Sequence, residues 1–200
     1  TGCLVAPGLV LTAMHVVANR QASPPTLLAG TIVLSFPTHR CEATVVEDRW
    51  DPRSDWALRR CATPPAGVRP VPLADSVNDG EEWETFGFPD ANSRDGLAQL
   101  GTVENANGTF ETVAAYQLFS RQAAAGVGAP VKGLSGGPVI VDGALVGVFR
   151  SSLMREGQFN VAGTLYACPV ETILARCADL LPIPDPCRGL PGLPRQPLPP

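Results

Sequence analysis

The sequence predicts an all-β fold of antiparallel barrels or sandwiches with one C-terminal helix. Many short runs rich in Val, Thr, Ile and Phe alternate with turns that contain Pro, Gly, Asn or Asp. Asp142-Gly143, between two apolar runs, is the strongest hairpin signal. One longer segment, which begins at Pro169, has apolar residues at helical spacing. Many short strands with one late helix favour antiparallel sheets.

The expected elements are short. Strands are expected at Cys3–Val5, Leu9–Thr12, Leu27–Phe36, Ala43–Arg49, Trp56–Cys61, Glu82–Gly87, Leu97–Asn105, Phe110–Phe119, Pro138–Val141, Leu145–Arg150 and Val161–Ala167. A single helical turn is expected around Ala13–Ala18, and a longer helix from Pro169 to about Leu181. Proline suits the first turn of that helix, and Glu171 lies near its positive end.

The composition is that of one globular unit. With 200 residues, 44% hydrophobic and 17% charged, the chain is long enough to bury a substantial core. A net charge of −4 gives no electrostatic reason to expect nucleic acid, and no apolar run reaches the ~20 residues of a membrane-spanning helix. We expect a domain over residues 1–183 whose partner is a protein, peptide or small-molecule substrate, not nucleic acid or a membrane.

The two ends of the chain differ from its middle. The first residues already resemble a strand, so we expect the natural N-terminus to lie upstream of Thr1. Residues 184–200 form a Pro-rich tail, and eight of the 21 prolines fall within residues 182–200. Proline fixes the backbone and removes amide donors. The tail is therefore expected to be either an extended spacer to a downstream domain or a disordered terminus.

The six cysteines allow two interpretations. They could form three disulfides or act as small buried hydrophobic side chains, and for a chain of this length the two weigh about equally. No Cys-x-x-Cys pair and no interleaved histidine spacing occurs, so a zinc site is not expected.

Three segments carry residues whose chemistry fits together. His15 follows a strand that ends in Thr-Ala, in the run LTAMHVV. Asp55 opens an apolar strand in the run SDWAL, and Ser135 lies in the glycine turn GLSGGPV that leads into another strand. A serine hydroxyl attacks well only when an imidazole takes its proton, and a carboxylate fixes the tautomer of that imidazole. The amides of Gly133 and Ser135 are the candidates for an oxyanion hole.

Alternatives to these residues exist nearby. His39, the other histidine, lies in the run PTHR and is expected in a loop. Asp48 and Asp51 are close to Asp55, but only Asp55 directly precedes an apolar strand. We therefore predict His15 as the base, Asp55 as the orienting acid and Ser135 as the nucleophile, with neither metal nor cofactor.

The segments TAMH, DWAL and GLSGGP, in this order, resemble those of the trypsin-like serine proteases over nearly the whole chain. TFGFP at Thr85–Pro89 and LYACP at Leu165–Pro169 are similar to segments of the bacterial, HtrA-like branch. The resemblance implies two perpendicular six-stranded antiparallel β-barrels with a C-terminal helix. His15 and Asp55 would come from the first barrel and Ser135 from the second.

Two departures from the family pattern indicate which branch of the family this chain resembles. Digestive-type relatives carry an aspartate directly before the nucleophile, where it pairs with a newly cleaved N-terminus, but this chain has Leu134. They also carry a cysteine after the histidine, where this chain has Val16. Both departures favour the bacterial, often intracellular branch, and with it free thiols rather than disulfides. A cytoplasmic location is expected, with a periplasmic or secreted one as the alternative.

The resemblance also implies where substrate specificity is set. Ala129, six residues before the serine, would lie at the floor of the primary pocket, and Phe149-Arg150-Ser151-Ser152 would form its wall. Alanine at the floor cannot select Lys or Arg, so we expect the pocket to accept small or medium apolar residues. Arg150, if it points inward, would instead favour acidic residues.

The function expected from these observations is a serine endopeptidase that works through an acyl-enzyme, as a module of a larger regulated bacterial protein in defence or signalling. The first alternative is a periplasmic HtrA-like quality-control protease. The second is a catalytically silent, protease-like binding module. An esterase of the α/β-hydrolase type is disfavoured, because GLSGGP differs from the G-x-S-x-G motif of those enzymes.

Overall fold

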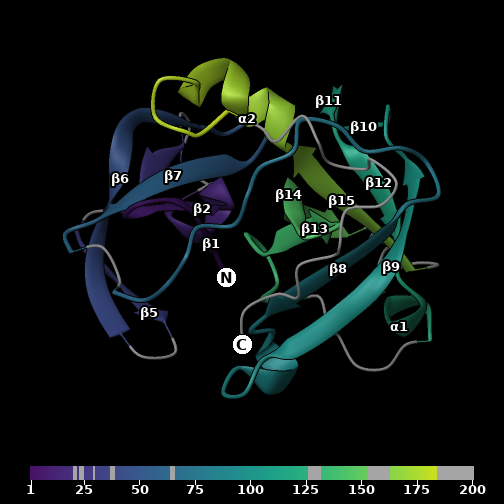
Figure 1. Ribbon diagram of the computed structural model, residues 1–200, viewed down its shortest axis with the longest axis horizontal. Coiled ribbons are helices and arrows are strands. Elements are labelled where there is room, and N and C mark those ends of the chain that lie inside the picture. Colours follow the sequence, from purple (N-terminus) through teal and green to yellow (C-terminus); the bar gives the residue numbers. More distant parts are fainter. Residues whose placement is uncertain are drawn as a thin grey trace.

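The computed structural model describes residues 1–19, 22, 25–28, 30–36, 39–63, 66–125, 132–152 and 163–183. Its strands form two lobes that lie side by side, with helix α2 (Val170–Cys177) above their junction (Figure 1). The expected all-β class, with a late helix, is confirmed.

The second lobe is a closed barrel of six antiparallel strands in the order β12-β15-β14-β13-β8-β9. Their bounds are β8 Glu82–Gly87, β9 Leu97–Asn105, β12 Tyr116–Phe119, β13 Pro138–Val141, β14 Ala144–Ser152 and β15 Thr164–Pro169. Asp142 and Gly143 join β13 to β14 with φ angles of 48° and 76°, which confirms the hairpin signal. Alternate side chains fill the interior, where Trp83 meets Phe149 edge to face with ring centroids 5.4 Å apart.

Among the described residues the first lobe is a curled five-stranded sheet in the order β1-β2-β7-β6-β5, a half-barrel that is consistent with the expected double-barrel fold (Figure 1). Its strands are β1 Cys3–Ala6, β2 Leu9–Thr12, β5 Ile32–Phe36, β6 His39–Asp51 and β7 Trp56–Cys61. Two further strands, β3 Ala18–Asn19 and β4 Thr26–Leu27, pair with each other. They follow η1 (Met14–Val16), a 3-10 helix of one turn. β7 is the central strand and is buried along nearly its whole length, so it holds the sheet together.

Helix α2 joins the two lobes. Trp56 of the first lobe, Leu145 of the second and Ile173 of the helix belong to one buried apolar cluster. At the rim, the Arg176 guanidinium donates to the carbonyls of Trp50 and Asp48, at 3.1 and 3.3 Å. No helix in the described ranges is long and apolar enough to cross a membrane.

Several elements differ from their expected form. The segment expected as one strand over Leu27–Phe36 is divided between β4 and β5. The strand expected over Phe110–Phe119 is three pieces, because Glu111 and Thr112 adopt φ angles of 50° and 68° and reverse the chain between β10 (Thr109–Phe110) and β11 (Val113–Ala114). Two short helices, η2 (Asp90–Asn92) and α1 (Arg121–Ala124), were not expected. His39 is not in a loop but begins β6, opposite Phe36.

Candidate active site

Strands β2 and β7 bring His15 and Asp55 together. Thr12, which ends β2, pairs with Ala57 near the start of β7, so the residues just beyond β2 meet those just before β7. The Nδ1 atom of His15 lies 2.7 Å from Oδ2 of Asp55. Because a carboxylate only accepts hydrogen bonds, Nδ1 carries the hydrogen. Nε2 is then the nitrogen that can take a proton from a nucleophile.

Asp55 holds the histidine backbone as well as its ring. Its Oδ1 accepts the His15 backbone N–H at 3.0 Å, and its carbonyl accepts the Met14 N–H at 3.1 Å. Asp55 is only 1% exposed and has a φ of 60°. The left-handed conformation costs a side-chain-bearing residue about 1–2 kcal/mol, although aspartate tolerates it better than most. The bonds to two consecutive residues offset this cost and fix the direction of the carboxylate.

Ser135 lies in a turn that is bonded to β14. The Gly137 N–H donates to the Leu134 carbonyl at 2.7 Å, which closes the turn around the serine. The Gly136 N–H then donates to the Phe149 carbonyl at 2.8 Å, and the Phe149 N–H donates back to Gly137 at 2.9 Å. The serine side chain is half-buried. These bonds place the nucleophile candidate at the start of β13, against the middle of the second lobe.

The same turn lies directly against the strand that leads to His15. A Cβ atom on Gly136 would lie 2.3 Å from the Thr12 hydroxyl, 2.4 Å from the Thr1 carbonyl and 2.8 Å from the Ala13 nitrogen. The Thr12 hydroxyl donates to that Thr1 carbonyl at 2.7 Å, and the Thr1 nitrogen donates to the Ser135 carbonyl at 3.2 Å. The contact between lobes therefore brings Ser135 beside the residues that precede His15.

Replacing Gly136 with alanine should destabilise the protein by about 2–4 kcal/mol and abolish the site. The new methyl group would collide with Thr12 and with backbone atoms, at a φ of 81° that favours glycine. Gly80→Ala is a matched control, since Gly80 has a φ of 85° and open space around its Cβ position. Urea unfolding should show a loss for Gly80→Ala of only about 1–2 kcal/mol. Equal losses for both variants would contradict the tight contact between lobes.

The backbone that carries the candidate oxyanion-hole amides is bonded to Asp90. The Asp90 N–H donates to the Lys132 carbonyl at 2.8 Å, and the two side chains form an ion pair at 2.7 Å. In a trans peptide the N–H points opposite to the C=O. The Gly133 N–H, which shares a peptide with the Lys132 carbonyl, is therefore directed away from Asp90. Neither this amide nor that of Ser135 bonds to another described residue, so both are available as donors.

The Ser135 hydroxyl makes no hydrogen bond within the described part of the chain. In the described structure this hydroxyl therefore forms no direct hydrogen bond to His15. Hydrogen bonds of this kind are often long before substrate binds and tighten in the complex.

The expected specificity residues have different surroundings. Ala129 lies outside the described residues. The Phe149 ring packs inside the closed barrel against Trp83, and its backbone bonds to the turn that carries Ser135. Its ring edge also borders this turn, 3.7 Å from the Cβ position of Gly137. Ser151 and Ser152 end β14 and are half-buried. Among the four residues expected to form the pocket wall, only these two serines are exposed enough to contact a substrate.

Arg150 lies between the two lobes. Its side chain is 1% exposed, and its guanidinium donates to the Arg53 carbonyl at 3.0 Å and pairs with Glu111 at 3.2 Å. The guanidinium also lies 5.0 Å from the centre of the Phe110 ring. Arg53 is two residues before Asp55, so the bond from Arg150 supports the turn that carries the Asp55 carboxylate. In this arrangement its charge is already paired, which argues against selection of acidic substrate residues.

Replacing Arg150 with alanine should lower kcat about 10- to 100-fold and leave KM nearly unchanged, because the Asp55 turn would lose its support. Arg150→Lys should recover part of the loss, and Glu111→Gln should have little effect, since Glu111 is 63% exposed. Steady-state kinetics with neutral and acidic peptides, together with melting temperatures, would check this. A rise in KM restricted to acidic peptides would show instead that Arg150 lines the pocket.

No described cysteine competes as a nucleophile. Cys3, Cys41, Cys61, Cys168 and Cys177 are free and buried. Burial raises the pKa of both Cys3 and Cys61 to about 12, so these thiols stay protonated at neutral pH. Cys187 lies outside the described residues. Within the described ranges, no three His, Cys, Asp or Glu side chains gather where they could hold a metal ion.

Several contacts at this site were not found from the sequence. Thr1, Asp90 and Arg53 act through backbone groups or through residues distant in the chain. Backbone donors and acceptors are present in every residue type, so the sequence carries no signal for them. Arg150 did carry a signal in the sequence, because an arginine within an apolar strand needs a partner for its charge.

Comparisons with known proteins bear on the family and the fold of the chain. A family model described as the trypsin-like peptidase domain matches residues 1–148. The active form of the Rv3671c protease from M. tuberculosis is 20% identical, with a TM-score of 0.66 over 92% of this chain and 74% of that chain. Its inactive form is also 20% identical, with a TM-score of 0.63 over 90% and 82%.

The HtrA-type protease AlgW, solved with a decapeptide, is 20% identical, with a TM-score of 0.62 over 86% of this chain and 48% of that chain. At such identities the likeness shows the fold alone. No curated protein matches the chain.

Proposed function

The chain belongs to the trypsin-like peptidase family and is a serine endopeptidase, and we propose that His15, Asp55 and Ser135 form its catalytic triad. The observation that carries this proposal is the pair of hydrogen bonds that the Asp55 carboxylate accepts from the ring and from the backbone N–H of His15. The close contact of Gly136 with Thr12 and Ala13 supports it, because that contact brings the serine turn beside the histidine.

In the proposed mechanism the Ser135 Oγ attacks the scissile carbonyl carbon while His15 Nε2 takes the hydroxyl proton. The negative charge on the carbonyl oxygen is stabilised by the amides of Gly133 and Ser135. The C–N bond then breaks, and His15 passes its proton to the leaving amine, which leaves an ester on Ser135. Water, deprotonated by His15, hydrolyses this ester and frees the serine. Asp55 stabilises the imidazolium in both steps and keeps its own negative charge.

A fluorophosphonate probe tests the proposal directly, since it reacts with an activated serine without needing a specific substrate. An adduct on Ser135 is expected in the folded protein and not in urea. Peptide mass spectrometry would locate it. A folded protein that takes up no probe would contradict an active triad and favour the silent binding module.

We further propose that the domain is a module of a larger, regulated bacterial protein in defence or signalling, located in the cytoplasm. Leu134 supports regulation by a means other than the ion pair of digestive-type zymogens, because a buried leucine cannot bind a new amino terminus. The Pro-rich segment 184–200, which lies outside the described residues, is the proposed spacer to a downstream domain. Fractionation of native cells tests this. Recovery from the periplasm would instead favour an HtrA-like quality-control role.

A further inference from the structure

Two phenylalanines at the end of β8, Phe86 within the strand and Phe88 just after it, form an exposed aromatic pair. Phe86 and Phe88 meet edge to face with ring centroids 5.5 Å apart, yet they are 48% and 46% exposed. Large side chains usually bury more of their surface than this in a monomer, and neighbouring exposed apolar groups mark an interaction site.

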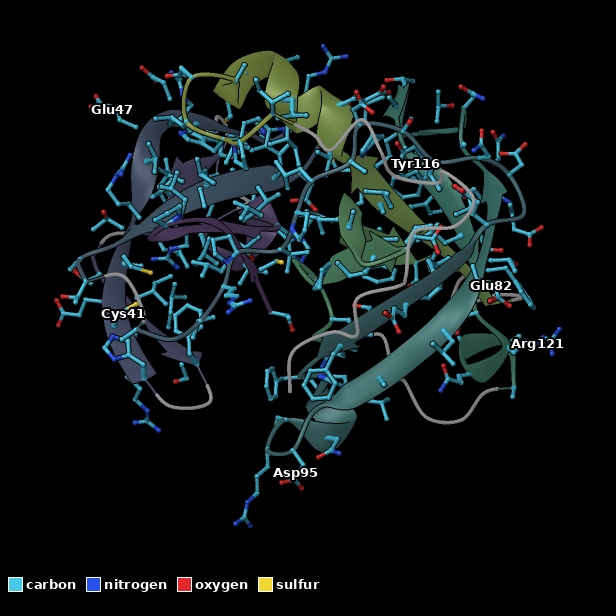
Figure 2. All side chains as sticks on the ribbon, viewed as in Figure 1. Cys41, Glu47, Glu82, Asp95, Tyr116 and Arg121 are labelled. Atoms are coloured by element: carbon cyan, nitrogen blue, oxygen red, sulfur yellow. The ribbon has the colours of Figure 1, made fainter. Side chains whose placement is uncertain are left out.

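The pair is part of a wider apolar surface on the outside of the closed barrel. Side chains alternate along β8, so Trp83, Thr85 and Gly87 face inward and Phe86 faces outward. Phe88, which follows the strand, packs against Phe86. Phe86 pairs with Ala98 on β9, and the neighbouring outward residue of β9 is Leu100, which is 60% exposed. We call Phe86, Phe88, Ala98 and Leu100 the aromatic patch. It lies toward the Asp95 end of the β8–β9 hairpin, away from Glu82 (Figure 2).

The aromatic patch lies close to the nucleophile turn. On the inner side of β8, a Cβ on Gly87 would lie 2.5 Å from the Leu134 side chain, which directly precedes Ser135. The Phe88 N–H donates to the Thr1 hydroxyl at 3.2 Å, and that hydroxyl donates to the Gly133 carbonyl at 3.2 Å. Strand β8 and the Leu134 side chain therefore lie between the aromatic patch and Ser135.

The order of strands decides which part of a substrate can reach this surface. In the barrel, β13 lies between β14 and β8, and Ser135 is just before β13. Ser151 and Ser152, which end β14, are the half-buried residues of the expected pocket wall, whereas Phe149 and Arg150 are buried. Residues upstream of the scissile bond would therefore lie on the β14 side. A substrate chain that crosses Ser135 from the β14 side would continue toward β8, the strand on the other side of β13.

We propose that the aromatic patch binds an apolar side chain of the substrate downstream of the scissile bond, two or three residues into the leaving segment. The proposal rests on the proposed endopeptidase function and adds a preference for its substrates. The exposed ion pair of Asp90 and Lys132 adjoins both sites, since Asp90 is two residues after Phe88 and contacts Gly133, so it provides a polar group beside the apolar surface. An apolar centre with a polar rim fits a peptide segment.

The test uses the full chain and quenched peptides that share one upstream sequence. The second and third residues after the scissile bond are Leu or Phe in one set and Ser or Asp in the other. Wild-type kcat/KM should be about tenfold higher for the apolar set. Phe86→Ser and Phe88→Ser should remove this preference, whereas Val33→Ser, at an equally exposed position of the first lobe, should retain it.

Fluorophosphonate labelling separates the two proposals, because the probe has no downstream residues. Normal labelling of the Phe86 and Phe88 variants, with the preference lost, is the expected result. Equal cleavage of both peptide sets by the wild type, or a preference that survives both substitutions, would overturn the patch while leaving the triad intact. A change in elution volume on substitution would show instead that a second copy of the chain covers the patch.

Discussion

Replacing Ser135 with alanine should lower kcat/KM for peptide hydrolysis by about 10⁶-fold. The hydroxyl is the only group of the proposed triad that forms a covalent bond to the substrate, and the cysteines of the described ranges are buried away from it. Stability should hardly change, since the Ser135 hydroxyl bonds to no other described residue and the turn is closed by backbone hydrogen bonds.

The measurement is hydrolysis of an internally quenched peptide, with urea unfolding of the same samples. Ser93→Ala is the control, because Ser93 is an exposed turn serine far along the chain from the site. A Ser135→Ala protein that is folded and keeps more than a hundredth of the activity would mean that another residue is the nucleophile.

Much of the fold could be predicted because its signals are local. β7, β8, β9 and β13 have the bounds expected from the sequence, since each is an apolar or alternating run enclosed by turn residues. The Asp142-Gly143 hairpin followed from the left-handed φ angles that these two residue types accept.

The parts that could not be predicted depend on contacts between distant residues. Whether the first sheet closes depends on the register of strands far apart in sequence, and no single run records it. The turn at Glu111 and Thr112 lacks a turn-forming residue type, yet Glu111 is bonded to Arg150 about 40 residues later. Tertiary contacts there override local preference.

The triad candidates could be identified because each has both the right side-chain chemistry and recognisable flanking residues. Thr-Ala before His15, an apolar strand after Asp55 and glycines around Ser135 are each visible in the sequence. The brace formed by Arg150 and Arg53 was invisible, because it depends on a backbone carbonyl in the opposite lobe. The exposure of Phe86 and Phe88 also depends on the way the barrel closes.

Replacing Asp55 with asparagine should lower kcat about 10⁴-fold with the fold intact. The amide is the same size, so its oxygen can still accept the His15 N–H, the bond that Oδ1 makes now. Its NH₂ group would then face Nδ1, where the carboxylate oxygen lies at 2.7 Å. A donor in that position requires Nδ1 to be the acceptor, so the hydrogen moves to Nε2 and the ring can no longer take the Ser135 proton.

Asp51→Asn is the matched control, because Asp51 is the nearest other carboxylate in the chain and its Oδ1 accepts the Arg53 N–H at 2.8 Å. An amide oxygen can keep that bond, so Asp51→Asn should retain most of the activity. Stopped-flow measurement of peptide cleavage, with the melting temperature of each variant, distinguishes the two residues. If Asp51→Asn were the more damaging change, the orienting acid would be Asp51, and the hydrogen bonds from Asp55 to His15 would serve only to fix the turn.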